Sequence, residues 1–198
     1  MWRGQGVRLA TSTWQGVDFV LPSGKQCIVS GPNGSGKSTL LRVLGGLLPS
    51  EGYVSLRGKR YCPYSAFWRR RVLYLGALQA GEVHACAYSY WRRQYFADQG
   101  RRIPLPLLDF LQQRLEIRRS GIYSLGEEQR IRLGILWLSR RPIWLLDDIY
   151  QHMDTDWQEV ISALLDRHCA HGGWIIRTQC LVTSAAVSID MEKAGAEQ

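Results

Sequence analysis

Residues 31–38 read Gly-Pro-Asn-Gly-Ser-Gly-Lys-Ser and match in full the G-x-x-x-x-G-K-S pattern of a phosphate-binding loop. The apolar run 26–30 before the loop predicts a strand, and residues 37–48 after it carry leucines at helical spacing. The glycines allow backbone N–H groups to turn inward around phosphates, and the helix N-terminus adds its positive end. A plain glycine-rich turn with a surface lysine is the alternative, which the flanking elements disfavour. The sequence therefore predicts a strand–loop–helix unit that binds a nucleotide.

Two side chains of this loop have distinct expected roles. Lys37 supplies a point charge for the β- and γ-phosphates, and Ser38 supplies a hydroxyl to Mg²⁺. The expected nucleotide-binding residues are Gly31, Pro32, Asn33, Gly34, Ser35, Gly36, Lys37, Ser38 and Thr39.

A carboxylate pair follows a second apolar run. Residues 143–146 read Ile-Trp-Leu-Leu, typical of a buried strand, and Asp147 and Asp148 come directly after them. A phosphate-binding loop needs a carboxylate to orient hydrated magnesium, and Asp147 is the predicted residue. Asp148 is the candidate that polarises the attacking water. The alternative is that both aspartates merely begin a loop.

The pattern of apolar residues alternates between strand and helix, which predicts an α/β domain with a mostly parallel sheet. Further strands are expected at 53–56 and 174–176, and helices at 127–140 and around 157–165. Residues 80–120 are expected to be helical in part, broken by Pro104 and Pro106. The length of 198 residues favours one domain, and 45% apolar with 21% charged residues excludes disorder, collagen and coiled coil for the bulk of the chain.

The cysteine and hydropathy patterns indicate in which cellular compartment the chain works. The five cysteines are odd in number and form no CxxC pair, so a disulfide framework or metal site is not expected and a reducing compartment fits better. No apolar stretch reaches the roughly 18 residues of a membrane span. The first six residues lack the apolar core of a signal peptide. We therefore expect a soluble chain that another molecule must hold at any membrane.

The order of motifs resembles the ABC ATPases. Residues 123–130, Tyr-Ser-Leu-Gly-Glu-Glu-Gln-Arg, lie between the loop and the aspartates, where that family has its Leu-Ser-Gly-Gly-Gln signature. Ser124 and Gly126 are kept, while Tyr123, Leu125 and Glu127 depart. The resemblance implies that Ser124 and Gly126 contact the γ-phosphate of ATP held by a second subunit. It thus implies a head-to-tail homodimer with ATP and Mg²⁺ at its interface.

The resemblance covers most of the chain. It implies a single ABC-type P-loop NTPase domain over residues 1–198, with a mostly parallel sheet, a small antiparallel β part and a helical subdomain inserted at roughly 80–140. Gln79 is placed like the family's glutamine loop, which touches Mg²⁺ and senses the membrane partner. Asp154 is placed like the D-loop aspartate, which faces the dimer partner. Trp14 is a candidate for stacking on adenine, and a core position is the alternative.

Three segments narrow the resemblance to the ATP-binding proteins of cytochrome c maturation: residues 136–140, 141–147 and 171–173. That subfamily energises a haem-handling membrane complex, described as a haem exporter or as the motor that releases a haem-loaded chaperone. The implied protein is peripheral, on the cytoplasmic face of the inner membrane or the matrix face of the mitochondrial one, and bound to an integral membrane subunit. Alternatives are the ATPase of another ABC transporter, an ATP-gated dimerising module with little hydrolysis, and a soluble ABC ATPase acting on nucleic acid.

Two departures from the family concern hydrolysis. Asp148 stands where the family has glutamate, so its oxygens would lie roughly 1.5 Å further from the water, a displacement that can cost about 10²-fold in rate. Gln179 stands where the family has its switch histidine, and an amide carries no titratable proton. The implied catalytic residues are Asp148, Gln79 and Gln179, the implied magnesium residues are Ser38, Asp147 and Gln79, and slow turnover is expected.

Basic residues give the chain a formal net charge of +8. Arginines cluster at 69–71, 92–93, 101–102, 118–119 and 140–141, with aromatic residues among them. This pattern has three interpretations: nucleic-acid contacts, a solvated face above core aromatics, or a surface that docks on a membrane subunit near acidic lipid. No recognised nucleic-acid module is present, so no nucleic acid is expected as a partner.

Overall fold

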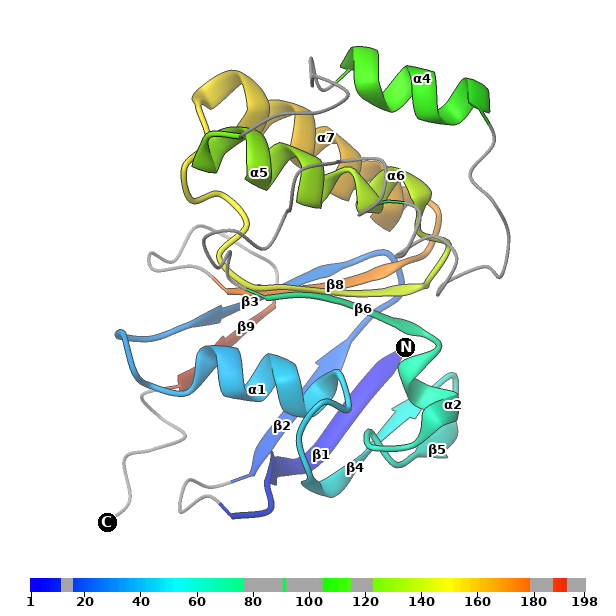
Figure 1. Cartoon of the computed structure of the whole chain (residues 1–198). Coiled ribbons are helices and arrows are strands. Elements are labelled where there is room, and N and C mark those ends of the chain that lie inside the picture. Colours follow the sequence, from blue (N-terminus) through cyan, green and yellow to red (C-terminus); the bar gives the residue numbers. More distant parts are fainter. Residues whose placement is uncertain (12–15, 77–90, 92–104, 115–122, 179–186, 192–198) are drawn as a thin grey trace. The chain divides into compact units, whose positions relative to one another are not determined.

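The computed structural model describes residues 1–11, 16–76, 91, 105–114, 123–178 and 187–191 (Figure 1). The chain forms two compact units. The first contains Met1–Gly76, Arg141–Asp148 and Leu165–Gln198, and the second contains Ala77–Arg140 and Ile149–Leu164.

A five-stranded parallel sheet forms the centre of the first unit. Its spatial order is β6 (Val72–Leu75), β7 (Ile143–Leu146), β8 (Trp174–Thr178), β3 (Gln26–Ser30) and β9 (Ser188–Asp190). The predicted strands at 26–30 and 143–146 are confirmed, and the one at 174–176 extends to residue 178. All four side chains of β7 are buried, as its unbroken apolar run indicates. The predicted parallel α/β architecture is therefore confirmed.

A second, antiparallel sheet belongs to the same unit. Its order is β2 (Val17–Leu21), β1 (Trp2–Leu9), β4 (Ser50–Leu56) and β5 (Lys59–Tyr61). Side chains of β2 alternate strictly between buried and exposed, so one face of this sheet packs on the core. This sheet is the small antiparallel part that was expected, and β4 begins three residues before the predicted 53–56.

Helix α1 (Lys37–Leu44) lies between the two sheets (Figure 1). Leu40, Leu41, Val43 and Leu44 of this helix are all fully buried in the core that both sheets share. The predicted helix 37–48 is wrong at its C-terminal end, because the helix stops four residues earlier.

The early stop has a local cause. Gly46 has φ +70°, its N–H donates to Val43 O at 3.0 Å, and the N–H of Leu47 donates to Arg42 O at 2.9 Å. These two bonds are the Schellman motif that ends a helix at a left-handed glycine. Leu47 is half exposed as a result.

Two further helices complete the first unit. The short helix α2 (Ala66–Arg69) is capped by Ser65. It buries Trp68, whose indole N–H donates to Leu44 O at 2.7 Å. Helix α7 (Thr155–Ala170) confirms the helical pattern around 157–165, and its C-terminal part belongs to this unit. Gly172, with φ +81°, follows the end of α7.

The second unit contains α4 (Leu105–Arg114), α5 (Leu125–Leu133), α6 (Ile135–Leu138) and the start of α7. The single helix predicted at 127–140 is wrong in two respects: it begins at Leu125 and it is broken at Gly134. The indole N–H of Trp91 donates to Ile131 O at 2.5 Å, which occupies the carbonyl that would continue the helix. A Cβ at Gly134 would lie 2.7 Å from that indole nitrogen.

Pro106 is the second residue of α4, so it lies in the first turn of a helix and does not break one. Pro104 lies outside the described residues. None of the helices that the structure describes is both long enough and apolar enough to cross a membrane.

Candidate nucleotide-binding site

The phosphate-binding loop connects β3 to α1. Gly31, Gly34 and Gly36 have φ values of +140°, +83° and +94°, which residues with a Cβ rarely adopt. A Cβ at Gly31 would also lie 2.8 Å from Ser35 Oγ. Gly36 is the N-cap of α1, no described side chain caps this helix, and its first turn carries no acidic residue. The N-terminus of α1 therefore offers N–H groups and a positive dipole end to an anion.

Lys37 turns back over its own loop. Its ammonium group donates to Gly31 O and to Pro32 O, each at 2.7 Å, and only 9% of the residue is exposed. A buried ammonium requires such partners, because an unpaired one would carry a large desolvation cost. The charge is thus held inside the loop, at the place where the sequence predicted a phosphate.

Asp147 follows β7 and is 1% exposed. Its Oδ1 accepts a hydrogen bond from Thr178 Oγ1 at 2.9 Å. Its Oδ2 is buried and has no hydrogen-bond partner among the described residues, and the same holds for Ser35 Oγ in the loop. A buried carboxylate oxygen without a partner fits a hydrated Mg²⁺, whose preferred protein ligands are oxygens.

Asp148 has an unusual backbone, with φ +50°. Its N–H donates to Thr178 Oγ1 at 2.9 Å. Burial raises the pKa of its carboxyl above the ordinary value, the charge of Asp147 raises it further, and Lys37 opposes the shift. A raised pKa suits a carboxylate that takes a proton from water.

Strand order explains why these residues meet. The strand β8 lies between β7 and β3, and Thr178 at its end pairs with Val29, two residues before Gly31. The carboxyl ends of parallel strands form one edge of a sheet, where ligands bind in open α/β folds. The sequence analysis assigned no role to Thr178. The available signal was a threonine at the end of a buried apolar strand.

Ser124 and Gly126 lie at the start of α5. Ser124 Oγ accepts from the N–H of Glu127 at 3.3 Å, and Glu127 Oε2 accepts from the N–H of Ser124 at 2.7 Å. These reciprocal bonds form a capping box. A Cβ at Gly126 would lie 3.2 Å from His152 O, so this glycine permits a close backbone approach. The box places a carboxylate at the helix N-terminus that was expected to contact a phosphate.

Asp154, the expected D-loop residue, caps α7. Its Oδ1 accepts from the N–H of Trp157 at 2.9 Å, and its Oδ2 pairs with Arg130 at 3.2 Å. The Arg130 guanidinium also lies 5.1 Å from the centroid of the Trp157 ring. The start of α7 is thereby tied to α5.

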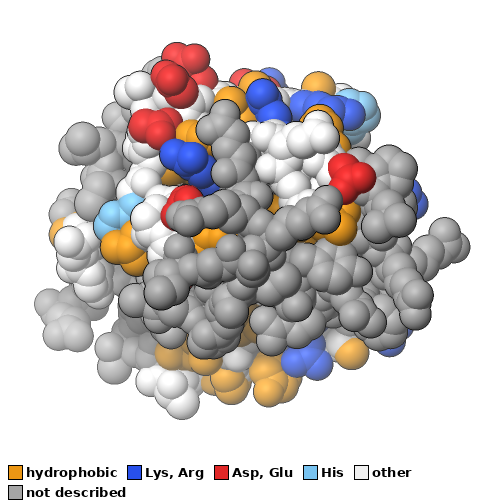
Figure 2. Space-filling model, turned by 45° about the horizontal axis from the view of Figure 1, so that its top comes forward, with side chains coloured by type: hydrophobic (Ala, Val, Ile, Leu, Met, Phe, Trp, Pro, Cys, Tyr) orange, Lys and Arg blue, Asp and Glu red, His pale blue; other side chains and the backbone are white. Residues whose placement is uncertain are grey.

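Several predicted residues lie outside the described part of the chain: Gln79, Gln179, Trp14 and the arginines at 92–93, 101–102 and 118–119. Among the described arginines, Arg71 lies 3.7 Å from the centroid of the Phe67 ring, which itself stacks on Tyr61 at 5.5 Å. Figure 2 shows Lys and Arg side chains lying among Asp and Glu side chains in the described part of the face that it presents. The three interpretations of the basic residues therefore stay predictions.

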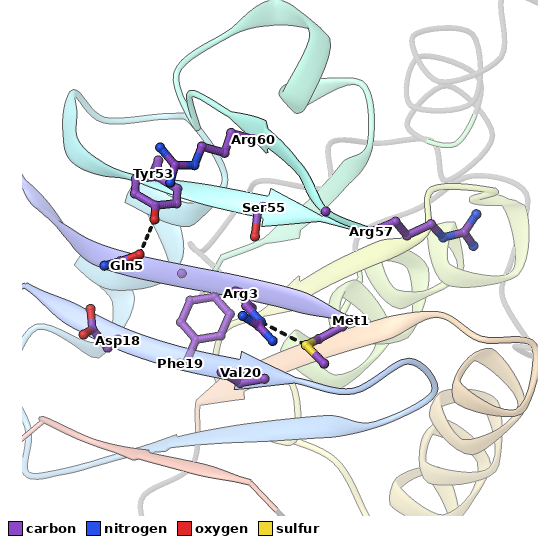
Figure 3. Close-up of a pocket in the computed structure, with 12 residues that line it drawn as sticks. Met1, Arg3, Gln5, Asp18, Phe19, Val20, Tyr53, Ser55, Arg57 and Arg60 are labelled. Atoms are coloured by element: carbon purple, nitrogen blue, oxygen red, sulfur yellow. Dashed lines mark hydrogen bonds between the residues drawn. The ribbon is translucent and has the colours of Figure 1, made fainter.

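A hollow of about 880 Å³ lies on the antiparallel sheet (Figure 3). The Arg60 guanidinium stacks over the Tyr53 ring at 4.2 Å there, and the Tyr53 hydroxyl donates to Gln5. None of the residues lining this hollow comes from the phosphate-binding loop or the aspartate pair. This hollow is therefore separate from the candidate nucleotide site.

The cysteines that the structure describes are free thiols. Burial raises the pKa of Cys27 to about 12 and that of Cys169 to about 11, while Cys62 is exposed. No group of three or more His, Cys, Asp or Glu residues in the described segments has the arrangement of a metal site.

Comparison with known proteins adds four findings. Residues 14–151 match the family model described as "ABC transporter". The chain is 32% identical over 186 residues to the cytochrome c biogenesis ATP-binding export protein CcmA of Haemophilus influenzae, covering 89% of this chain and 83% of that protein. A putative ABC transporter ATP-binding protein from Pyrococcus furiosus shares the fold, with a TM-score of 0.79 at 16% identity, covering 98% and 99% of the two chains. The cassette MJ0796, solved as a dimer bound to ADP and Pi, has a TM-score of 0.72 at 18% identity, covering 90% of this chain and 88% of that one.

Proposed function

Because the chain belongs to the ABC transporter family of ATP-binding proteins, we propose that it is the ATP-binding and ATP-hydrolysing subunit of a membrane complex for cytochrome c biogenesis. The observation that carries the proposal is the buried Oδ2 of Asp147, which has no hydrogen-bond partner in the part of the chain that the structure describes. It lies at the sheet edge that also holds the phosphate-binding loop. The similarity to CcmA over most of the chain supports the cytochrome c assignment.

Each residue has one part in this chemistry. The loop N–H groups and Lys37 would bind the phosphates, and Ser38 and Asp147 would hold Mg²⁺, whose contribution would be to neutralise charge on the phosphate oxygens. Asp148 orients the attacking water and takes up its proton, for which its raised pKa is suited. Gln79 and Gln179 complete the proposed magnesium and γ-phosphate contacts.

A homodimer with ATP at its interface is part of the proposal. Ser124 and Gly126 of one subunit would meet the γ-phosphate bound by the other, since a helix N-terminus suits an anion. The dimeric MJ0796 cassette with ADP and Pi supports this arrangement for a chain of the same fold.

Turnover is proposed to be slow. Asp148 is one methylene shorter than glutamate, and Gln179 offers an amide in place of an imidazole. An ATP-gated dimerising module with negligible hydrolysis is the alternative, favoured by the same two departures, Asp148 and Gln179. Steady-state ATP turnover of the assembled complex separates the two, because only the ATPase gives sustained phosphate release.

The proposed cargo and location follow the relatives. The complex would export haem or release a haem-loaded chaperone, and the chain would bind an integral membrane subunit at the cytoplasmic face of the inner membrane or at the matrix face of the mitochondrial one. Domain organisation is likewise proposed to be a single ABC domain over 1–198 with a helical subdomain near 80–140.

Membrane attachment provides the test. Membranes that contain the partner subunit should retain the chain through a high-salt wash, because protein docking buries apolar surface. Arginine-only attachment to lipid would be released by salt, since lipid electrostatics fade within a Debye length of about 8 Å. Salt-resistant binding to protein-free liposomes would contradict attachment through a partner. Co-purification of RNA or DNA instead of a membrane protein would contradict the transporter assignment.

A further inference from the structure

We propose that Thr178 is a positioning residue for ATP hydrolysis, whose single hydroxyl fixes the carboxylate of Asp147 and the backbone of Asp148 together. The inference rests on the proposed function and adds a residue to it. Thr178 is 3% exposed and lies at the end of β8.

The direction of the hydroxyl proton is determined by its two partners. Thr178 Oγ1 lies 2.9 Å from Asp147 Oδ1 and 2.9 Å from the backbone nitrogen of Asp148. An ionised carboxylate can only accept, and a backbone N–H can only donate. The hydroxyl therefore donates to Asp147 and accepts from Asp148, and neither role can be exchanged.

The first bond selects which carboxylate oxygen stays available. With Oδ1 engaged by Thr178, the carboxylate plane of Asp147 is held, and Oδ2 has no hydrogen-bond partner among the described residues. An oxygen held in one direction loses less rotational freedom when it meets the magnesium hydration shell. Thr178 thus prepares Asp147 before nucleotide arrives.

The second bond holds an unusual backbone. Asp148 has φ +50°, a left-handed conformation that a residue with a Cβ adopts only where its surroundings require it. Its N–H is fixed by Thr178, so the peptide unit between Asp147 and Asp148 cannot turn freely. The position of the Asp148 carboxylate then depends on the same hydroxyl.

The order of the strands places Thr178 between the phosphate-binding loop and the two aspartates. The strand β8 pairs with β7 on one side and with β3 on the other, and Thr178 itself pairs with Val29 of β3. One side chain therefore links the strand that leads into the phosphate-binding loop to both aspartates that follow β7.

Two substitutions separate the hydroxyl from the shape of the side chain. Thr178→Val is close in shape and loses both hydrogen bonds, and Thr178→Ser retains the hydroxyl and is the matched control. For the full chain assembled with its partner, Thr178→Val should lower kcat at least tenfold. It should also raise, several-fold, the Mg²⁺ concentration needed for half-maximal ATP binding. ATP affinity in EDTA should stay within about twofold, and Thr178→Ser should stay within about threefold of wild type throughout.

A measurement without nucleotide tests the backbone bond directly. The amide proton of Asp148 should exchange with solvent at least tenfold faster in Thr178→Val than in wild type or Thr178→Ser, as followed by NMR. If the valine variant folds poorly, Thr178→Ala can replace it, because alanine lacks the hydroxyl and adds no methyl group in its place. Thr178→Ala should show the same faster amide exchange and the same decrease in kcat.

The outcomes are distinct. Unchanged kcat, Mg²⁺ dependence and amide exchange in a folded Thr178→Val overturn the inference, and so does equal loss in Thr178→Ser. If the wild-type chain shows no Mg²⁺-dependent ATP binding, the proposed function is contradicted instead. The hydrogen bonds of Thr178 would still be supported in that case if Asp148 amide exchange is faster in Thr178→Val than in Thr178→Ser.

Discussion

The Nζ atom of Lys37 lies 2.7 Å from the carbonyl oxygen of Gly31, so the ammonium group is bound by the loop to which it belongs. Pro32 O provides a second acceptor at 2.7 Å. Both partners are neutral, whereas phosphate oxygens are charged and form hydrogen bonds roughly twice as strong. The ammonium can therefore exchange its loop partners for a nucleotide with a net gain.

Replacing Lys37 with alanine should remove this gain. Loss of a charge-assisted contact costs about 1.5–3 kcal/mol, which corresponds to a roughly 10- to 150-fold weaker affinity. Titration with a fluorescent ATP analogue measures the change. Lys25→Ala, which removes an exposed lysine near β3, serves as the control and should bind normally. Equal affinities in the two variants would disprove the placement of the phosphate at this loop.

Lengthening the side chain at position 148 tests whether aspartate limits the rate. Asp148→Glu should raise ATP hydrolysis by the assembled complex, or leave it unchanged, because glutamate extends the carboxylate by one methylene. Phosphate release at saturating ATP measures the rate. If wild type already turns over at about 1 s⁻¹ or faster and the glutamate variant is slower, the backbone at φ +50° has adapted to aspartate.

Removing the charge of Glu127 should favour the ATP-bound dimer. Glu127→Gln retains a capping-box side chain, since glutamine serves equally in this motif. It removes a carboxylate from the helix N-terminus that is proposed to meet the partner's γ-phosphate. We expect dimerisation with ATP to become several-fold tighter, as measured by analytical ultracentrifugation. Glu159→Gln, at an exposed position of α7, is the charge-matched control. A weaker dimer in Glu127→Gln would show that the carboxylate contributes to the interface.

Protonation of His168 should destabilise the fold in mild acid. Burial lowers its pKa below the ordinary 6.5, nearby His171 adds to this, and a hydrogen bond with Pro142 O at 3.2 Å opposes it. The unfolded chain therefore binds a proton to this ring at pH values where the folded chain does not. Stability is then complete above about pH 6.5 and declines as the pH falls below it.

The measurement is the free energy of unfolding in urea at pH 7.5 and pH 5.5. His168→Phe retains an aromatic ring to stack on Trp144, where the centroids are 3.7 Å apart, and should flatten this difference. His152→Asn, a change at an exposed left-handed residue, should leave it unchanged. The same slope in His168→Phe as in wild type would rule out His168 as the titrating group.

The candidate nucleotide site could be proposed from the sequence because its signals are local. The loop 31–38 and the aspartates after β7 each consist of residues adjacent in sequence whose spacing is imposed by phosphate and metal chemistry. The early end of α1 was also signalled locally, since Gly45 and Gly46 are part of the Schellman turn. The leucine spacing continues past the two glycines to Leu48, so the predicted C-terminal end of α1 was four residues too late.

Other features depend on contacts that no local pattern reveals. The break at Gly134 depends on the indole of Trp91, which donates to the carbonyl of Ile131, 40 residues later in the chain. The strand β9 has only three residues, too few for a periodic signal. The bonds of Thr178 to Asp147 and Asp148 span about 30 residues and depend on which strands are neighbours.

Labelling of the buried thiol of Cys27 can measure how often the parallel sheet opens transiently. Cys27 is 0% exposed on β3, four residues before Gly31, and burial raises its pKa to about 12. A thiol reagent can modify it only in molecules whose sheet has opened, so the labelling rate measures that population. A ligand of the folded loop lowers this population by the factor 1 + [L]/Kd. The labelling rate of Cys27, measured against that of exposed Cys62 as the internal reference, should therefore fall as nucleotide is added. This decrease gives the Kd of a nucleotide that carries no fluorescent group.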